Sequence, residues 1–92
     1  MSGDEQVKIM IVDDHDMVRL GLKTYLMLEP SFSVIAECSD GQAALQLLNS
    51  IDEADHPDLI LMDLMMPVMN GIDATRSIVT QYPAMKIVML TS

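Results

Sequence analysis

The chain has little cysteine, few basic residues and no long apolar run, and each of these shortages argues against a class of protein or site. Cys38 is the only cysteine among 92 residues, which rules out an internal disulfide and a cysteine-based metal site. Five basic residues stand against 14 acidic ones, and a net charge of −9 disfavours binding to nucleic acid or to anionic membranes. Because no apolar run approaches the roughly 18 residues of a membrane span and the polar N-terminus lacks signal-peptide features, we expect a cytoplasmic protein.

The residues that are present predict one small α/β domain. Half of the chain is hydrophobic, and apolar runs too short for helices alternate with amphipathic segments. The predicted strands are Val7–Val12, Phe32–Cys38, Leu59–Asp63 and Lys86–Leu90. The predicted helices are Met17–Leu28, a second one capped by Asp40 and ending near Ile51, and Gly71–Gln81. The third helix is predicted to turn five residues toward the core: Ile72, Ala74, Thr75, Ile78 and Val79. This alternation predicts a parallel sheet with right-handed crossovers.

Acidic residues follow two of the predicted strands. Asp13 and Asp14 come directly after the first strand, and Asp63 ends the third. In a parallel sheet these strand ends lie at the same edge, where open α/β sheets bind their ligands. Three carboxylates would repel one another there unless a hard cation such as Mg²⁺ sat among them. The pattern therefore indicates metal-assisted phosphoryl chemistry, with one carboxylate as the acceptor.

Two histidines and a glycine need interpretation beside the acids. His15 adjoins the acid pair and could be a metal ligand or a base, but the acids already satisfy a hard ion, so we interpret it as a solvated loop residue. His56 precedes Pro57 in a polar connector, and we assign it no function. Gly71 is predicted to have a backbone role at the start of the third helix.

Three segments together resemble a known family. The acid pair in IMIVDDHDMVR, the lone acid in LILMDLMMPVMNGIDA and the strand-end hydroxyl in IVMLTS match the receiver domain of bacterial two-component response regulators in spacing and order. DDHDMVRLGLKTYL is most similar to regulators with a LuxR-type helix-turn-helix, in particular those that answer cell-envelope stress. The resemblance implies that residues 1–92 form one receiver domain with a flavodoxin-like (CheY-like) doubly wound parallel sheet.

Residue by residue, the resemblance implies a phosphorylation site. Asp63 would be the phosphoacceptor, and the donor would be a phosphohistidine on a sensor histidine kinase. Mg²⁺ is the implied cofactor, with Asp14 and Asp63 as direct ligands, Asp13 as a ligand through water and the backbone carbonyl of Met65 as a further ligand. The other implied groups are the switch hydroxyl of Thr91, the phosphoryl-binding backbone N–H groups of Leu64 and Ser92, and the structural residues Pro67 and Gly71.

The chain also departs from the family pattern. Receiver domains continue through a further helix, strand and helix, so we expect a truncated βαβαβαβ fold whose DNA-binding effector domain is absent. The family's fifth-strand lysine has no counterpart here, because Lys8, Lys23 and Lys86 stand at other positions. The exposed fourth strand would favour a homodimer or a strand-exchanged oligomer. DNA would be bound only through the absent domain.

Several other functions remain to be weighed. A truncated receiver that folds but no longer signals stays open. A phosphatase of the haloacid dehalogenase type needs a second acid two residues after the nucleophile, and that position is Met65. A nucleotide- or flavin-binding module needs a glycine-rich first turn, whereas residues 13–16 would repel phosphate. We therefore expect a phosphorylatable signalling switch and not a turnover enzyme.

Overall fold

The computed structural model describes residues 6–66 and 69–90. Within these ranges the strands are β1 (Val7–Val12), β2 (Phe32–Cys38), β3 (Leu59–Asp63) and β4 (Lys86–Leu90). The helices are α1 (Asp16–Leu26), α2 (Gly41–Ser50) and α3 (Gly71–Gln81), with a short 3₁₀ helix η1 (Glu53–Asp55) after α2. The predicted strand bounds are confirmed, and α1 ends slightly earlier than predicted. None of these helices has the length and apolar character to cross a membrane.

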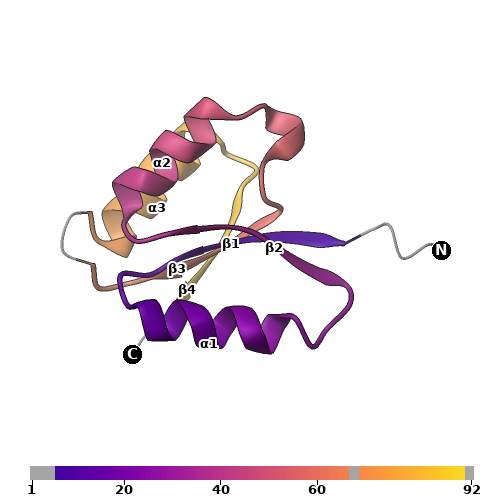
Figure 1. Ribbon diagram of the computed structural model, residues 1–92. Helices are drawn as coiled ribbons and strands as arrows, with labels where there is room; N and C mark the ends of the chain where they lie inside the picture. Colours follow the sequence, from indigo (N-terminus) through magenta and orange to yellow (C-terminus); the bar gives the residue numbers. More distant parts are fainter. Residues whose placement is uncertain (1–5, 67–68, 91–92) are drawn as a thin grey trace.

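The four strands form one parallel sheet in the order β2-β1-β3-β4. Helix α1 lies on one face of this sheet, while α2 and α3 lie side by side on the other (Figure 1). Val12 pairs with Met62 across β1 and β3, so the residues that follow these two central strands emerge next to each other. This register brings the acids of the first and third strands to one edge. β4 forms one edge of the described sheet, and self-association through it stays a prediction.

The core lies between the sheet and the two-helix face. Its largest strand residues are fully buried: Met10, Val12, Ile60 and Met62. Ala44 of α2 and Ala74 of α3 are also fully buried, and small side chains at these positions let the helices approach closely. The two helix starts are capped locally, because the carboxylate of Asp40 accepts from the N–H of Ala43 and the amide oxygen of Asn70 accepts from the N–H of Asp73.

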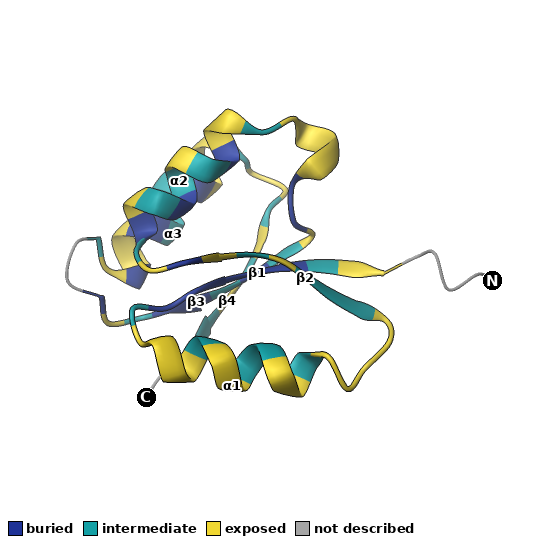
Figure 2. Cartoon of the chain, viewed as in Figure 1, coloured by how far each residue is buried: buried dark blue, intermediate teal, exposed yellow. Residues whose placement is uncertain are grey.

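The single-helix face is much more exposed (Figure 2). None of the residues of α1, all of which the structure describes, is buried, and Met17 and Tyr25 are about three-quarters exposed. α1 packs mainly on β2 without a second helix beside it in the described ranges, so its apolar stripe is only partly covered. On α3 the predicted burial is correct for Ala74 and Ile78 and wrong for Ile72 and Val79, whose exposed fractions are 54% and 39%.

The connector after α2, which is polar in sequence, is partly buried. His56 and Pro57 are buried, and η1 precedes them. The Nε2 atom of His56 lies 2.8 Å from the carbonyl oxygen of Leu48, which can only accept, so Nε2 carries the proton and donates. The ring also meets Tyr82 edge-on at a centroid distance of 5.0 Å. His56 therefore ties the end of α2 to the end of α3, which makes it a structural residue.

Candidate functional site

The predicted gathering of the three acids is confirmed. One carboxylate oxygen each from Asp13, Asp14 and Asp63, together with a ring nitrogen of His15, lie within 4.8 Å of one another. Asp13 and Asp63 are both buried, with exposed fractions of 4% and 5%. Adjacent strands deliver these side chains, because β1 and β3 are paired up to Val12 and Met62. The result is a concentrated negative charge at the carboxyl edge of the sheet.

The acid cluster contains an unsatisfied acceptor. Among the described residues, the buried Oδ1 atom of Asp14 has no hydrogen-bond partner, although Nδ1 of His15 lies 3.0 Å away without hydrogen-bonding geometry. A buried acceptor without a donor costs about 1–3 kcal/mol. A divalent cation would satisfy it, and carboxylate oxygens are the ligands that hard cations prefer. The side chains present therefore fit a Mg²⁺ site.

His15 is exposed, as predicted for a solvated loop residue, but its ring also lies against the acids. Its Nδ1 atom is 3.0 Å from Oδ1 of both Asp13 and Asp14, and its backbone N–H donates to Oδ1 of Asp13 at 2.8 Å. The hydrogen bond to Asp13 and the negative charge of Asp14 raise the pKa of the His15 imidazole. Adjacency to the acid pair was the available signal in the sequence, but only the loop conformation shows which way the ring turns.

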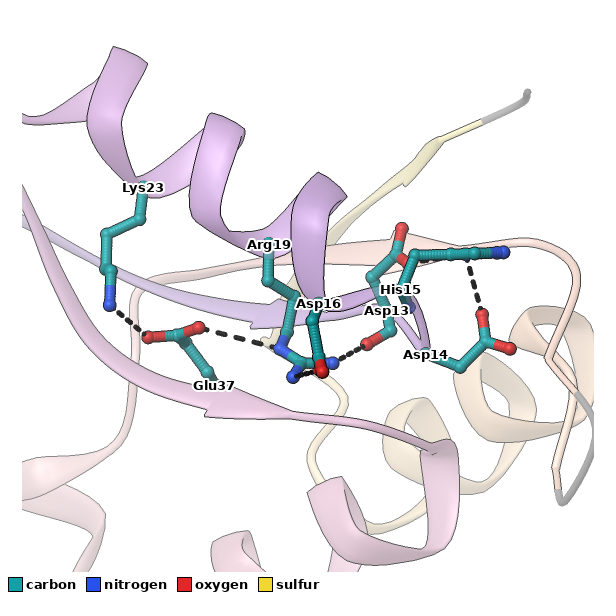
Figure 3. Close-up of polar contacts among 7 residues, drawn as sticks. All are labelled: Asp13, Asp14, His15, Asp16, Arg19, Lys23 and Glu37. Atoms are coloured by element: carbon teal, nitrogen blue, oxygen red, sulfur yellow. Dashed lines mark hydrogen bonds and ion pairs between the residues drawn. The ribbon is translucent and has the colours of Figure 1, made fainter.

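Arg19, which the sequence offers either as a solvated helix residue or as a counter-charge to the acids, holds the acid loop (Figure 3). Nη1 of Arg19 donates to the backbone carbonyl of Asp13 at 2.5 Å, and Nη2 contacts Asp16. Nε lies 3.5 Å from Glu37 of β2, and Lys23 binds the other oxygen of Glu37 at 2.8 Å. Arg19 is mostly buried, whereas Lys23 is more exposed. The guanidinium thus joins the loop of the acid pair to α1 and β2.

We expect Arg19→Met to lower the free energy of unfolding by about 1–2 kcal/mol, because it removes a charged donor from the Asp13 carbonyl while keeping the apolar stem. Lys23→Met is the matched control and should cost at most about 1 kcal/mol, since it removes only a partly exposed ion pair. Urea unfolding without divalent ions measures both changes. Equal costs for the two variants would contradict a special role for the Asp13 contact.

The phosphoacceptor candidate is held by its own loop. The N–H of Met65 donates to Oδ1 of Asp63 at 3.1 Å, which fixes the carboxylate and leaves its second oxygen to react. The N–H of Leu64, a predicted phosphoryl contact, donates here to the carbonyl of Leu90 at 3.1 Å and would have to exchange that partner. The carbonyl of Met65 stays a predicted ligand. The predicted roles of Pro67, Thr91 and Ser92 lie outside the described residues.

Gly71 lies close to the acid-bearing strand end. Its N–H donates to the carbonyl of Leu64 at 3.0 Å. A Cβ atom on Gly71 would fall 2.3 Å from the carbonyl oxygen of Asp63 and 2.8 Å from Cα of Leu64. α3 therefore begins directly on the loop after β3, and only a glycine fits there. This close approach accounts for the predicted backbone role of Gly71.

Two hollows lie at opposite ends of the sheet. One of about 440 Å³ adjoins the acids and is lined by Asp13, His15, Val18, Leu22, Asp63, Met65 and Leu90. A larger one of about 660 Å³ lies near the amino ends of the strands, beside His56 and Tyr82. The smaller hollow has Asp13 and Asp63 on its wall and therefore offers a charged substrate access to the site, whereas none of the three acids lines the larger one.

Comparison with known proteins identifies the family of this chain. A family model for the response regulator receiver domain matches residues 9–92. The transcriptional regulatory protein DegU of Brevibacillus brevis is 41% identical over 88 residues, which are 96% of this chain and 36% of DegU. The transcriptional regulatory protein LiaR of Bacillus subtilis (strain 168) is 42% identical over 86 residues, which are 94% of this chain and 39% of LiaR. The chain thus spans well under half the length of these relatives.

A solved structure agrees with the sequence comparison. A two-component response regulator of the LuxR family from Aurantimonas sp. SI85-9A1 superposes with a TM-score of 0.84 at 36% identity, covering 94% of this chain and 59% of that one. The four parallel strands with helices between them match the CheY-like receiver fold, which confirms the predicted fold class. The chain belongs to the response regulator receiver domain family of two-component systems.

Proposed function

We propose that this chain is the phosphoacceptor module of a two-component system. Asp63 takes a phosphoryl group from a sensor histidine kinase, with Mg²⁺ as cofactor. The observation that carries the proposal is the convergence of Asp13, Asp14 and Asp63 at one sheet edge, with an oxygen of Asp14 left without a donor among the described residues. Such a carboxylate set is costly for folding and useful for binding a metal and a phosphoryl group.

Each residue of the site has its own role in the proposed phosphoryl transfer. The Met65 N–H holds Oδ1 of Asp63. Oδ2 would then be the oxygen that attacks the incoming phosphorus atom. An O–P bond forms as the P–N bond to the donor histidine breaks, which leaves an acyl phosphate on Asp63. Asp14 and Asp63 would hold Mg²⁺ directly, Asp13 through water, and the Met65 carbonyl would complete the protein ligands. When bound, the cation neutralises the oxygens of the transferred group and aligns the transfer.

The relatives suggest what the module serves. DegU and LiaR are both transcriptional regulatory proteins. We propose that this receiver likewise controls a transcription regulator in the cytoplasm, through a DNA-binding domain outside these 92 residues. In this role the chain is a switch that is phosphorylated once per signalling event and not a turnover enzyme.

Intact-mass measurement after incubation with acetyl phosphate and Mg²⁺ tests the proposal. We expect one added phosphoryl group on the natural chain, none on Asp63→Asn, and none when Mg²⁺ is removed with a chelator. Asp52→Asn, which alters an exposed acid before η1, is the matched control and should be phosphorylated normally. An adduct that persists in Asp63→Asn would contradict the assignment. Failure of the folded natural chain to gain any phosphoryl group would instead favour a receiver that does not signal.

A further inference from the structure

We propose that His15 is a nitrogen ligand of the metal site and makes its preference for first-row transition ions over Mg²⁺ stronger than that of a site built from carboxylates alone. The inference rests on the proposed function, because it concerns the same metal site. The acids predict only oxygen ligands. The structure adds an imidazole nitrogen to the same small cluster.

The spacing of the ligand atoms supports this assignment. Metal–ligand bonds of about 2.0–2.1 Å place neighbouring ligands about 3.0 Å apart in an octahedral sphere. Nδ1 of His15 lies 3.0 Å from Oδ1 of Asp14, which is the oxygen without a hydrogen-bond partner among the described residues. The close approach without hydrogen-bonding geometry is what two neighbouring ligands of one ion would show. The whole four-residue set lies within 4.8 Å, and opposite ligands in such a sphere are about 4.2 Å apart.

The backbone holds His15 in this position. His15 precedes the first residue of α1, and its N–H donates to Oδ1 of Asp13. Arg19 holds the carbonyl of Asp13 from the other side, so the loop is fixed at both the carboxylate and the carbonyl of Asp13 (Figure 3). The ring itself is 64% exposed, which leaves it free to make the small adjustment that ligation needs. In the structure Nδ1 donates to Oδ1 of Asp13, so ligation requires that proton to be released to solvent, and the neutral ring then keeps its remaining proton on Nε2.

The chemistry of an imidazole ligand predicts which metal ions bind more tightly. Imidazole suits Zn²⁺, Ni²⁺ and Cu²⁺, whereas Mg²⁺ takes oxygen ligands and keeps several waters. A nitrogen in place of a water should therefore strengthen transition-ion binding and leave Mg²⁺ binding almost unchanged. The quantity that reports on His15 is the ratio of the two affinities, because any carboxylate site binds transition ions more tightly than Mg²⁺ to some degree.

Calorimetric titration of the chain with Zn²⁺ and with Mg²⁺ tests the proposal. We expect His15→Ala to weaken Zn²⁺ binding at least about tenfold, an effect that losing even an outer-sphere partner can have at metal sites. Mg²⁺ binding should change by less than about twofold. Nitrogen NMR gives a second readout: Zn²⁺ should shift the Nδ1 signal of His15 and leave that of the buried His56 in place.

The outcomes separate this inference from the proposed function. If Mg²⁺ binds the natural chain and His15→Ala leaves Zn²⁺ affinity unchanged, the nitrogen ligand is overturned and the phosphoacceptor assignment stands. If Zn²⁺ binding depends on His15 while Mg²⁺ does not bind, the nitrogen ligand stands and the Mg²⁺-dependent function fails. Binding of neither ion would overturn both.

Discussion

Gly71→Ala is expected to lower the free energy of unfolding by about 3 kcal/mol or more, although alanine is the better helix former. The new Cβ would lie 2.3 Å from the carbonyl oxygen of Asp63, and the neighbouring obstacles are also backbone atoms of residues 63 and 64. Backbone atoms of a central strand cannot turn aside as a flexible side chain can. To relieve the clash, either α3 or the end of β3 must shift, and Asp63 of the acid cluster lies at that end of β3.

Gly21→Ala is the matched control. Gly21 lies inside α1, and nothing among the described atoms comes within 4 Å of the position that its Cβ would occupy. The same change there should raise the free energy of unfolding by about 0.5–1 kcal/mol, through helix propensity alone. Urea unfolding of both variants measures the contrast, and each kcal/mol should move the melting temperature by about 4–8 °C. Similar effects at the two glycines would show that the close approach at Gly71 is not rigid.

The sequence was sufficient for the secondary structure and for the location of the acids. Short apolar runs bounded by turn residues predicted the strands. The side chains of Asp40 and Asn70 cap the following helices through hydrogen bonds to residues only three positions further along the chain. The acids could be placed together because one rule, that parallel strands end at a common edge, acts on any such sheet. These features depend on local pattern and topology, which a sequence displays directly.

The features that the sequence did not reveal depend on contacts between distant segments. The sequence places His56 in a polar connector and gives it no function, and only the structure brings the carbonyl of Leu48 and the ring of Tyr82 against it. Arg19 could be interpreted from the sequence as a solvated helix residue or as a counter-charge to the acids, and only the structure shows its guanidinium at the Asp13 carbonyl. Ile72 is apolar and at helical spacing, but it is 54% exposed because no described element covers it. Periodicity marks an apolar face without saying whether a neighbour is present to bury it.

The acid cluster lowers the stability of the fold in the absence of a cation, although the proposed function requires it. Neighbouring carboxylates and an acceptor without a donor lower stability in the absence of a cation, and residues that break the usual packing rules concentrate at functional sites. His15 and Arg19 offset part of this repulsion, one at the carboxylates and one at the Asp13 carbonyl. A variant that neutralises one acid should therefore be more stable than the natural chain until a cation is added.

Asp14→Asn is therefore expected to raise the free energy of unfolding by about 1 kcal/mol in a chelating buffer. The change removes one negative charge from the cluster, and the amide can donate to a neighbouring carboxylate where Asp14 only accepted. Exposed Asp52→Asn is the control and should change stability by less than about 0.5 kcal/mol. Urea unfolding in the chelating buffer measures all three chains.

Addition of Mg²⁺ should reverse this order, and the reversal is the larger effect. A ligand that binds only the folded state adds about 2.7 kcal/mol at 100 times its dissociation constant. The natural chain and Asp52→Asn should both gain this, whereas Asp14→Asn should gain almost nothing, because the proposed direct ligand is missing. Packing alone can hardly make a variant more stable than the natural chain without Mg²⁺ and less stable than the natural chain with Mg²⁺, since the effect of a packing change would persist in both buffers. Equal Mg²⁺ gains in Asp14→Asn and the natural chain would show that the orphaned oxygen is not a metal ligand.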